Sequence, residues 1–280
     1  MQHSMDLARH IRHAVGVVLL AAALLFSAAV PPCAGATEFT YVPNAPNGPE
    51  NWGTFKPEWA ECSTGQMQSP IDLSDDNATL VRSLGYLDYS YRPALATIIN
   101  TGHDIKVIFK GDAGSLRING TVYPLKQLHW HTPSEHTIDG RRYDMEVHLV
   151  HITPENKIAV VGVLYKVNLI FPDLFLKKLE PFIVAVAATR DQELPIGLVD
   201  PNDAACTGCV YYRYMGSLTT PPCTEGVIWT VCKKVRPVQK SQIDLLQGAV
   251  DPDNKMNARP LQQLNNRDVS VFRPLLKLLC

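Results

Sequence analysis

Apolar and polar residues alternate along the middle of the chain. Residues 86–165 show this alternation and are rich in Val, Ile, Thr and Tyr, which is typical of successive β-strands with one buried face. The pair Asn119-Gly120 predicts a tight hairpin turn between Leu116 and Tyr123, because both turn residues tolerate a left-handed backbone. Two further strands are predicted, at residues 211–216 and 227–231.

Helical signals are few. Residues 171–188 have a partly helical pattern, and residues 241–249 predict a short helix that opens on the capping residue Ser241. Residues 37–70 are rich in Pro, Gly and Asn, and we expect them to form an irregular arm around the core. The 280 residues contain no internal repeat or low-complexity linker. The pattern therefore predicts one β-dominated domain with a few surface helices.

Composition and charge exclude some classes of partner. Hydrophobic residues make up 46% of the chain, which is enough for a sizeable core, and the formal net charge is -1. A nucleic-acid-binding domain would carry a basic excess, and a solvated tail would carry a run of like charges. Neither feature is present, so we expect no nucleic-acid partner.

The N-terminus is typical of an export signal. Arg9 and Arg12 precede an uncharged apolar run at residues 14–30, and Ala34-Gly35-Ala36 follows. This order predicts a signal peptide over residues 1–36 and a mature domain over residues 37–280. A membrane anchor is the alternative, although the run is shorter than the about 20 residues that span a bilayer. We therefore expect a secreted or otherwise extracytoplasmic protein (extracellular, periplasmic or in an organelle lumen) with no stable membrane span after cleavage.

Cysteine usage agrees with export. One of the seven cysteines, Cys33, lies in the predicted leader. The other six form an even set that is compatible with disulfides in an oxidising compartment, namely Cys62, Cys206, Cys209, Cys223, Cys232 and Cys280. The pair Cys206 and Cys209 has no thioredoxin-like context, so we interpret it as structural. Asn77 and Asn119 begin sequons for glycosylation.

Two predicted strands bring histidines together. In a strand, side chains at i and i+2 share a face, so Gln127, His129 and His131 project together. Glu146 and His148 share a face of a second strand. The intervening segment is long enough to reverse the chain, and an antiparallel pairing would place His148 against the first two histidines.

Three histidines on two rigid strands suit a catalytic zinc. Such a site leaves the fourth position of the metal open, whereas a structural zinc site is closed by a fourth protein ligand. Gln127 and Glu146 are placed to accept hydrogen bonds from the second nitrogens of His129 and His148. The residues alone leave alternatives open, since His-x-His also occurs on polar faces and in cores. Three other histidines compete as ligands on chemistry alone, namely His103, His136 and His151.

The segment at residues 134–150 reads Ser-Glu-His-Thr-Ile-Asp-Gly-Arg-Arg-Tyr-Asp-Met-Glu-Val-His-Leu-Val and resembles the signature of the α-carbonic anhydrases. Other blocks resemble the same family in the same order, at residues 47–52, 68–71, 100–103, 216–222 and 257–262. The resemblance covers residues 41–275. It implies a mixed, β-dominated single domain on a large, mostly antiparallel twisted central sheet with a few peripheral short helices.

The resemblance also implies a reaction and its residues. His129, His131 and His148 would hold Zn²⁺, and a zinc-bound hydroxide would attack carbon dioxide to give bicarbonate and a proton. Thr219 would accept a hydrogen bond from that hydroxide and pass its own proton to Glu135. The backbone N–H of Thr219 would meet the bound oxygen of the substrate.

Other positions complete the implied site. Thr220 would line the substrate site, and His103 would carry the proton to buffer, since an imidazole titrates near neutral pH. The apolar wall for carbon dioxide would consist of Val150, Val160, Leu218 and Trp229. Taken without the resemblance, His103 would be an exposed turn histidine beside a glycine.

The sequence leaves some features of the site undecided. Thr101 and Lys106 flank the shuttle where better-known members of the family often carry amides, and they put the efficiency of the shuttle in doubt. Cys62 and Cys223 resemble the disulfide pair of secreted members. The remaining four mature cysteines allow three pairings.

Two other functions compete with a carbonic anhydrase. One is a binding module on this fold, for which lost zinc ligands would be the sign. The other is a storage or extracellular matrix protein that retains activity as a secondary trait; extra domains would favour it, and the sequence shows none. All three candidate zinc ligands are present, and Glu135 and Thr219 accompany them. This favours the hypothesis of an active carbonic anhydrase. The sequence does not indicate the oligomeric state.

Overall fold

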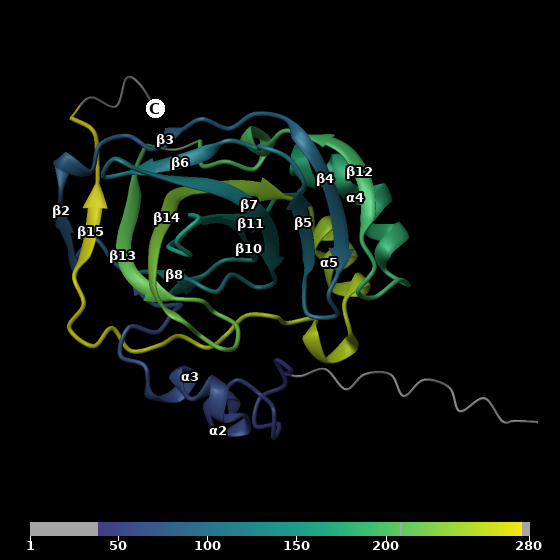
Figure 1. Cartoon of the computed structure of the whole chain (residues 1–280), viewed down its shortest axis with the longest axis horizontal. Helices are drawn as coiled ribbons and strands as arrows, with labels where there is room; N and C mark the ends of the chain where they lie inside the picture. The colour runs from purple at the N-terminus through teal and green to yellow at the C-terminus, as the bar shows by residue number, and fades with distance from the viewer. Residues whose placement is uncertain (1–38, 208, 276–280) are drawn as a thin grey trace, which may run out of the picture. The chain divides into compact units, whose positions relative to one another are not determined.

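The computed structural model describes residues 39–207 and 209–275. The predicted leader over residues 1–36 and Cys280 lie outside the described residues. Strands dominate the described chain and form one large twisted sheet of 12 strands and a small sheet of 3 (Figure 1). The predicted fold class is confirmed. Within the described ranges no helix is long and apolar enough to cross a membrane.

The large sheet is mostly antiparallel, with parallel pairing only at β11–β14 and β15–β2. In the order of pairing its strands are β12 (Leu194–Val199), β4 (Ala94–Asn100), β5 (Ile105–Phe109), β7 (Thr121–His131), β10 (Met145–Ile152), β11 (Ile158–Val167), β14 (Glu225–Val238), β13 (Tyr211–Ser217), β15 (Val269–Phe272) and β2 (Ala78–Leu80). Beside β7 lie β6 (Ser115–Ile118) and then β3 (Asp88–Tyr89). The small sheet consists of β1 (Asp72–Leu73), β8 (Thr137–Ile138) and β9 (Arg141–Arg142).

Two longer helices pack on one face of the large sheet, α4 (Leu174–Val186) and α5 (Lys240–Ala249) (Figure 1). The predicted helix start at Ser241 is wrong. The N-cap of α5 is Gln239, which exchanges hydrogen bonds with Gln242 in a capping box. The arm is also more ordered than predicted, because it holds short helical turns. The short helices of the described chain are α2 (Trp52–Phe55), η1 (Pro57–Trp59), α3 (Glu61–Thr64), η2 (Arg82–Leu84), η3 (Pro201–Asp203) and η4 (Pro252–Asn254).

The predicted hairpin turn is confirmed. Asn119 and Gly120 both have positive φ, 48° and 80°, as two-residue turns between antiparallel strands require. The turn joins β6 to β7 with Ile118 paired to Thr121. It therefore sets the register of β7, the strand that carries two of the candidate ligands.

The two faces of β7 have opposite environments. Leu128 and Trp130 are buried in the main core, where the ring of Trp130 lies 6.1 Å from that of Phe175 on α4. His129 and His131 project from the other face, as the alternation of a strand requires. Burial of the apolar face fixes which side the histidines occupy, because a one-residue slip would bury them in the core.

Disulfides link distant parts of the described chain. Cys62 pairs with Cys223, as the family resemblance implies, and Cys206 pairs with Cys232. Cys209 is disulfide-bonded as well. Cys62 and Cys223 are buried among the aromatic rings of the N-terminal arm, so their bond ties that arm to the loop after Thr220.

His151 on β10 predicts a loss of stability in acid. Burial lowers its pKa from 6.5 to about 4, and its two nitrogens bond the Tyr91 hydroxyl at 2.6 Å and the Ala159 carbonyl at 3.1 Å. Between these pH values the unfolded chain binds one more proton than the folded chain, so acidification favours unfolding. We expect this residue to reduce the free energy of unfolding by about 3 kcal/mol between pH 7 and pH 4.

Denaturant titrations at several pH values, on the wild type and on His151→Gln, measure this contribution. The variant should show a shallower loss of stability between pH 7 and pH 4. Parallel pH profiles for the two proteins would contradict the assignment.

Candidate metal centre

Three histidines converge from two neighbouring strands. In the β7–β10 pairing, His148 lies directly opposite His129, and Glu146 lies opposite His131. One ring nitrogen from each of the three histidines lies within 4.8 Å of the others. The predicted antiparallel pairing is therefore correct, and it brings the three rings onto one face.

Each histidine uses its second nitrogen in a hydrogen bond. His129 Nδ1 donates to Gln127 Oε1 at 2.9 Å, and His148 Nε2 donates to Glu146 Oε1 at 3.0 Å, as the spacing predicts. His131 Nδ1 donates to the Asn257 carbonyl at 2.7 Å, a partner that sequence reasoning missed. These bonds fix the ring orientations and leave one nitrogen of each ring for a metal.

The donor set fits a zinc ion. Nε2 of His131 is buried and has no hydrogen-bond partner in the described part of the chain, which would cost free energy unless a metal used its lone pair. Three imidazole nitrogens with an open fourth position are the ligand set of several catalytic zinc sites.

Burial keeps two of the candidate ligands, His129 and His148, neutral. Burial, followed by the neighbouring His131 and His148, holds the pKa of His129 well below its usual value. Burial also lowers the pKa of His148. Since only the neutral imidazole binds a metal, both rings are in the form that a ligand needs near neutral pH.

Glu146 supports the candidate metal centre through hydrogen bonds. Its Oε2 accepts hydrogen bonds from the backbone N–H groups of Glu135 and His136, each at 2.9 Å. Burial raises the pKa of Glu146, but the rings of His136 and His148 lower it more, so that it lies well below the usual value. The carboxylate is therefore ionised and can hold the His148 ring in place.

Two of the competing histidines, His136 and His151, are excluded as ligands by their own bonds. His136 Nδ1 donates to Glu146 at 2.8 Å, and its Nε2 lies 2.7 Å from the Tyr214 hydroxyl. Both nitrogens of His151 are engaged in the same way with Tyr91 and Ala159. The structure thus brings together only His129, His131 and His148 with free nitrogens among the described residues.

Glu135 lies beside the histidines. It is fully buried, its Oε1 accepts a hydrogen bond from the Arg259 backbone N–H at 2.9 Å, and its Oε2 has no partner in the described ranges. Oε2 lies 3.9 Å from His148 Nδ1. Thr219 lines the cavity above the histidines, and no hydrogen bond joins it to Glu135 in the described chain. Sequence reasoning missed the contribution of Arg259.

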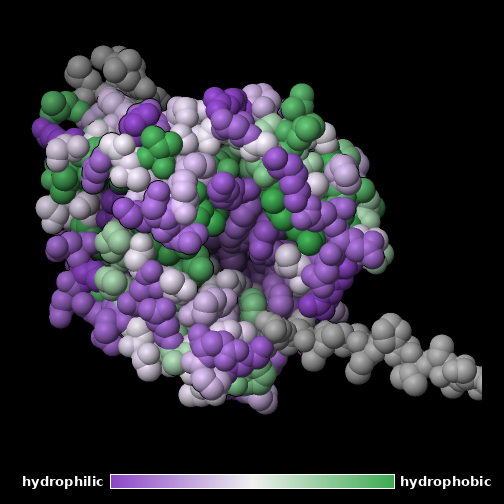
Figure 2. Space-filling view, in the orientation of Figure 1, coloured by the Kyte–Doolittle hydropathy of each residue, from purple (hydrophilic) through white to green (hydrophobic). Residues whose placement is uncertain are grey.

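A cavity of about 210 Å³ opens over the histidines. In the orientation of Figure 1 it corresponds to the hollow at the centre of the face shown in Figure 2, around which hydrophilic (purple) and hydrophobic (green) surface both appear. His129, His148 and both threonines, Thr219 and Thr220, belong to its lining. The site therefore combines a buried polar floor with access from solvent.

One wall of the cavity is apolar. It contains all four residues that the resemblance implies, Val150, Val160, Leu218 and Trp229. Ile152 and Ile158 extend this wall and were missed, although each lies one i+2 step from an implied residue and the alternation of a strand would have placed it. The opposite wall is polar and contains Asp104, Lys106 and Gln127.

His103 is not part of the cavity lining. Its ring stacks on Phe39 with the centroids 3.9 Å apart and the planes 14° apart, and Nε2 donates to the Phe39 carbonyl at 2.7 Å. The N-terminal arm thus holds the ring of the expected shuttle. No sequence pattern indicated this contact, because it joins two segments through tertiary packing.

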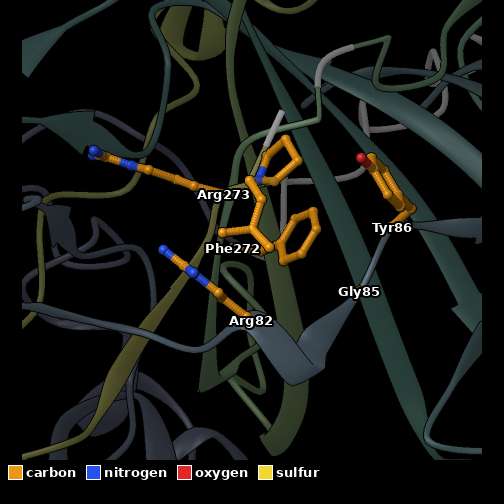
Figure 3. Close-up of a pocket in the computed structure, with 7 residues that line it drawn as sticks. Arg82, Gly85, Tyr86, Phe272 and Arg273 are labelled. Atoms are coloured by element: carbon orange, nitrogen blue, oxygen red, sulfur yellow. The ribbon is translucent and has the colours of Figure 1, made fainter. Parts of the chain in front are cut away.

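A second hollow, of about 310 Å³, lies by β15 and is lined by Arg82, Gly85, Tyr86, Phe272, Arg273, Pro274 and Leu275 (Figure 3). It is larger than the cavity over the histidines but contains none of the candidate residues. Arg82 and Arg273 extend away from Tyr86 in Figure 3. We therefore place the chemistry in the smaller cavity.

Comparisons with known proteins give a consistent result. The sequence model of the eukaryotic-type carbonic anhydrases matches residues 47–273. Alpha carbonic anhydrase 7 of Arabidopsis thaliana is 48% identical over 85% of this chain and 86% of its own length. Dioscorin DB3S of Dioscorea polystachya is 46% identical over 94% of this chain and 96% of its own length.

Solved structures extend the likeness to three dimensions. A crystal structure of dioscorin complexed with ascorbate has a TM-score of 0.82 at 47% identity and covers 85% of this chain and 99% of that one. The α-carbonic anhydrase of Thermovibrio ammonificans in complex with the inhibitor sulfanilamide has a TM-score of 0.75 at 34% identity, and covers 85% of this chain and 100% of that one.

Proposed function

Because this chain belongs to the eukaryotic-type (α) carbonic anhydrase family, we propose that it is an enzyme that catalyses the reversible hydration of carbon dioxide to bicarbonate and a proton. The observation that carries this proposal is the convergence of three free imidazole nitrogens, from His129, His131 and His148, beside an open cavity that His129 and His148 line. The substrate is a small molecule, and the site needs no macromolecular partner.

The metal of the proposed enzyme is zinc, held by His129, His131 and His148. Zinc bound in such a site acts as a Lewis acid and lowers the pKa of water to about 7, a value established for carbonic anhydrases. Gln127, Glu146 and the Asn257 carbonyl keep the three rings in the tautomer and orientation for binding.

Glu135 and Thr219 orient the nucleophile in this proposal. The buried Oε2 of Glu135 lacks a donor in the described ranges, and the Thr219 hydroxyl is the donor that the proposal assigns to it. The Thr219 oxygen then has to accept a hydrogen bond from the nucleophile, because its own proton is already used. The nucleophile is thereby turned toward the substrate instead of toward solvent.

The apolar wall would hold carbon dioxide next to the nucleophile. Val150, Val160, Leu218 and Trp229 face the cavity and offer no strong hydrogen bond, so they favour an uncharged substrate over water. The indole N–H of Trp229 donates to the Ser217 carbonyl at 2.9 Å and is therefore satisfied away from the substrate. Thr220 and the Thr219 backbone N–H supply the polar contacts for bicarbonate.

We assign the transfer of the proton from the cavity to buffer to His103. Its ring must leave the contact with Phe39 to serve the cavity. We expect His103→Ala to lower kcat for hydration by about tenfold or more at low buffer concentration, since positioned proton transfer contributes about 10²–10⁴-fold.

Stopped-flow hydration across a series of buffer concentrations measures this effect. Imidazole buffer should restore the kcat of the variant, and kcat/KM should change much less than kcat. Equal kcat for the two proteins at low buffer concentration would show that protons leave by another route. In that case Phe39→Ala should also leave kcat unchanged.

Removal of the metal tests the proposed reaction. Treatment with a zinc chelator should abolish hydration, and stoichiometric zinc should restore it, because no other described group is placed to lower the pKa of water in this way. Hydration that survives complete removal of zinc would contradict the proposal.

We propose that the mature enzyme comprises residues 37–280 and works outside the cytoplasm. The bonds Cys62–Cys223 and Cys206–Cys232 fit an oxidising compartment, and the first 36 residues have the order of a signal peptide. N-terminal sequencing of the exported protein should begin near Thr37. A mature chain that retains the apolar run would instead support a membrane anchor.

The binding-module and storage alternatives are less well supported. A module that only binds has no need of three convergent imidazoles, each with a hydrogen-bond partner on its second nitrogen. A storage role would not require the unpaired, buried Oε2 of Glu135 beside them. Both features are explained by catalysis.

A further inference from the structure

Between β11 and α4 the chain exposes a short apolar segment that the proposed reaction does not use. Leu169, Ile170 and Phe171 are consecutive, and 93%, 73% and 60% of their respective surfaces are exposed. Leu174, the first residue of α4, is exposed as well. Single exposed apolar side chains are common on soluble proteins, whereas a run of three indicates a contact surface. We call these four residues the apolar tip.

Hydrogen bonds hold the backbone of the apolar tip in place. Asn168 Oδ1 accepts hydrogen bonds from the backbone N–H groups of Ile170 and Phe171, each at 2.8 Å, as in a turn that an Asn side chain closes. The Asn168 backbone N–H donates to the Val238 carbonyl at 2.8 Å. The Gln239 side-chain amide donates to the Ile170 carbonyl at 3.5 Å. The turn therefore keeps the apolar side chains directed outward.

Asp173 anchors the other end of the segment. Its buried side chain accepts a hydrogen bond from the Leu176 N–H at 2.8 Å and forms an ion pair with Arg236 at 2.8 Å. Its backbone N–H donates to Gln242 Oε1 at 2.8 Å. Groups other than the apolar side chains thus fix the segment at both ends. Replacing side chains of the apolar tip should therefore leave the fold intact.

Lysines border the apolar tip. Lys166 precedes it on β11, and Lys177 and Lys178 follow on α4, all three exposed. Lys177 pairs with Glu180, and Lys178 pairs with Asp203, both at 2.7 Å. Ion pairs between such exposed groups contribute little stability, so another anion can replace these carboxylates. The segment between β11 and α4 itself has no exposed carboxylate.

This chemistry matches the surface of a lipid bilayer with anionic headgroups. Apolar side chains bordered by lysines are typical of segments that lie in a membrane interface. The long stem of a lysine lets its ammonium stay among the headgroups while apolar neighbours insert, and an anionic surface attracts it. A protein partner fits less well, because a specific interface takes about 20–30 residues from each side, far more than the apolar tip supplies.

We propose that the apolar tip inserts into the surface of a lipid bilayer, and that Lys166, Lys177 and Lys178 then contact anionic headgroups. The contact is peripheral and needs no membrane-spanning segment. In Figure 1 α4 lies at the margin of the molecule, whereas the hollow over the histidines faces the viewer in Figure 2. The bound protein therefore keeps its cavity open to solvent. The inference goes beyond the proposed hydration and does not depend on it.

Co-sedimentation with lipid vesicles tests the proposal on the purified mature protein. Vesicles of phosphatidylcholine and phosphatidylglycerol in equal parts should bind the wild type. The double variant Leu169→Ser, Phe171→Ser should bind at least about tenfold more weakly, because burial of even one such side chain contributes about that much. Its thermal unfolding should match that of the wild type.

The matched control is the double variant Leu80→Ser, Tyr86→Ser. Both residues are exposed and lie on or near β2, at one end of the large sheet, whereas α4 packs by β4 and β12 at the other end. This variant should bind vesicles like the wild type. A second pair, Lys166→Gln with Lys178→Gln, should bind the mixed vesicles about tenfold more weakly and pure phosphatidylcholine vesicles unchanged.

Two results would overturn the proposal, namely a wild type that does not bind the mixed vesicles and equal binding by the wild type and the Leu169→Ser, Phe171→Ser variant. Sedimentation velocity without lipid covers the remaining occupant. A dimer that this variant abolishes, together with no vesicle binding, would assign the apolar tip to a second copy of the chain instead. Carbon dioxide hydration should be equal in all these variants, and its absence from the wild type would leave the vesicle results unaffected.

Discussion

His131→Ala should lose zinc and carbon dioxide hydration together. The side chain is 1% exposed, its Nε2 is buried without a partner in the described ranges, and alanine leaves only two of the three ligands. Loss of an outer hydrogen-bond partner already costs about 10–100-fold in metal affinity or activity. Loss of a direct ligand should cost more, so we expect kcat/KM to fall by at least about a thousandfold.

His151→Gln is the matched control for this experiment. His151 is buried like His131, although it lies on β10 and not on β7, and both of its nitrogens bond groups away from the cavity. Zinc content by atomic absorption and stopped-flow rates should therefore match those of the wild type at neutral pH. The assignment of the ligands would be wrong if His131→Ala kept a full equivalent of zinc, or if His151→Gln lost it.

Replacement of both Cys62 and Cys223 by serine should produce the largest loss of stability. The bond joins residues 161 apart in sequence, and in the chain-entropy account a loop of this length stabilises the folded state by about 4–5 kcal/mol. The Cys62 carbonyl also accepts a hydrogen bond from Arg259 at 2.8 Å, and Arg259 holds Glu135 through its backbone N–H. We therefore expect reduced hydration as well as reduced stability.

The second disulfide gives the comparison. Cys206 and Cys232 are 26 residues apart, so their replacement by serine should cost about 1.6 kcal/mol less by the same loop-length dependence. Urea titrations of both double variants measure the two losses. An equal or larger loss for the Cys206–Cys232 variant would contradict the loop-entropy account.

Strand periodicity was sufficient to predict the two strands of the site. His129 and His131 share a face, and Leu128 and Trp130 lie on the other, because side-chain direction alternates and the apolar face must be buried. The same reasoning predicted Gln127 as the partner of His129. These features depend on neighbours in sequence, which a pattern can show.

Other features depend on contacts that no local pattern encodes. The Asn257 carbonyl that orients His131 is a backbone group, and backbone groups have no residue signature. The stacking of His103 on Phe39 arises from the path of the N-terminal arm. Gln239 caps α5 although serine is the more usual capping residue. The Cys62–Cys223 pairing was implied by family resemblance only, since the cysteine spacing leaves several pairings open.

The central claim is that the histidine cluster is a catalytic zinc site. Stopped-flow hydration of carbon dioxide by residues 37–280, with zinc content measured on the same sample, tests it most directly. We predict one zinc per chain and rapid hydration, with both lost when a chelator is added. One zinc per chain without hydration above the uncatalysed rate would contradict the claim and indicate a cavity used only for binding.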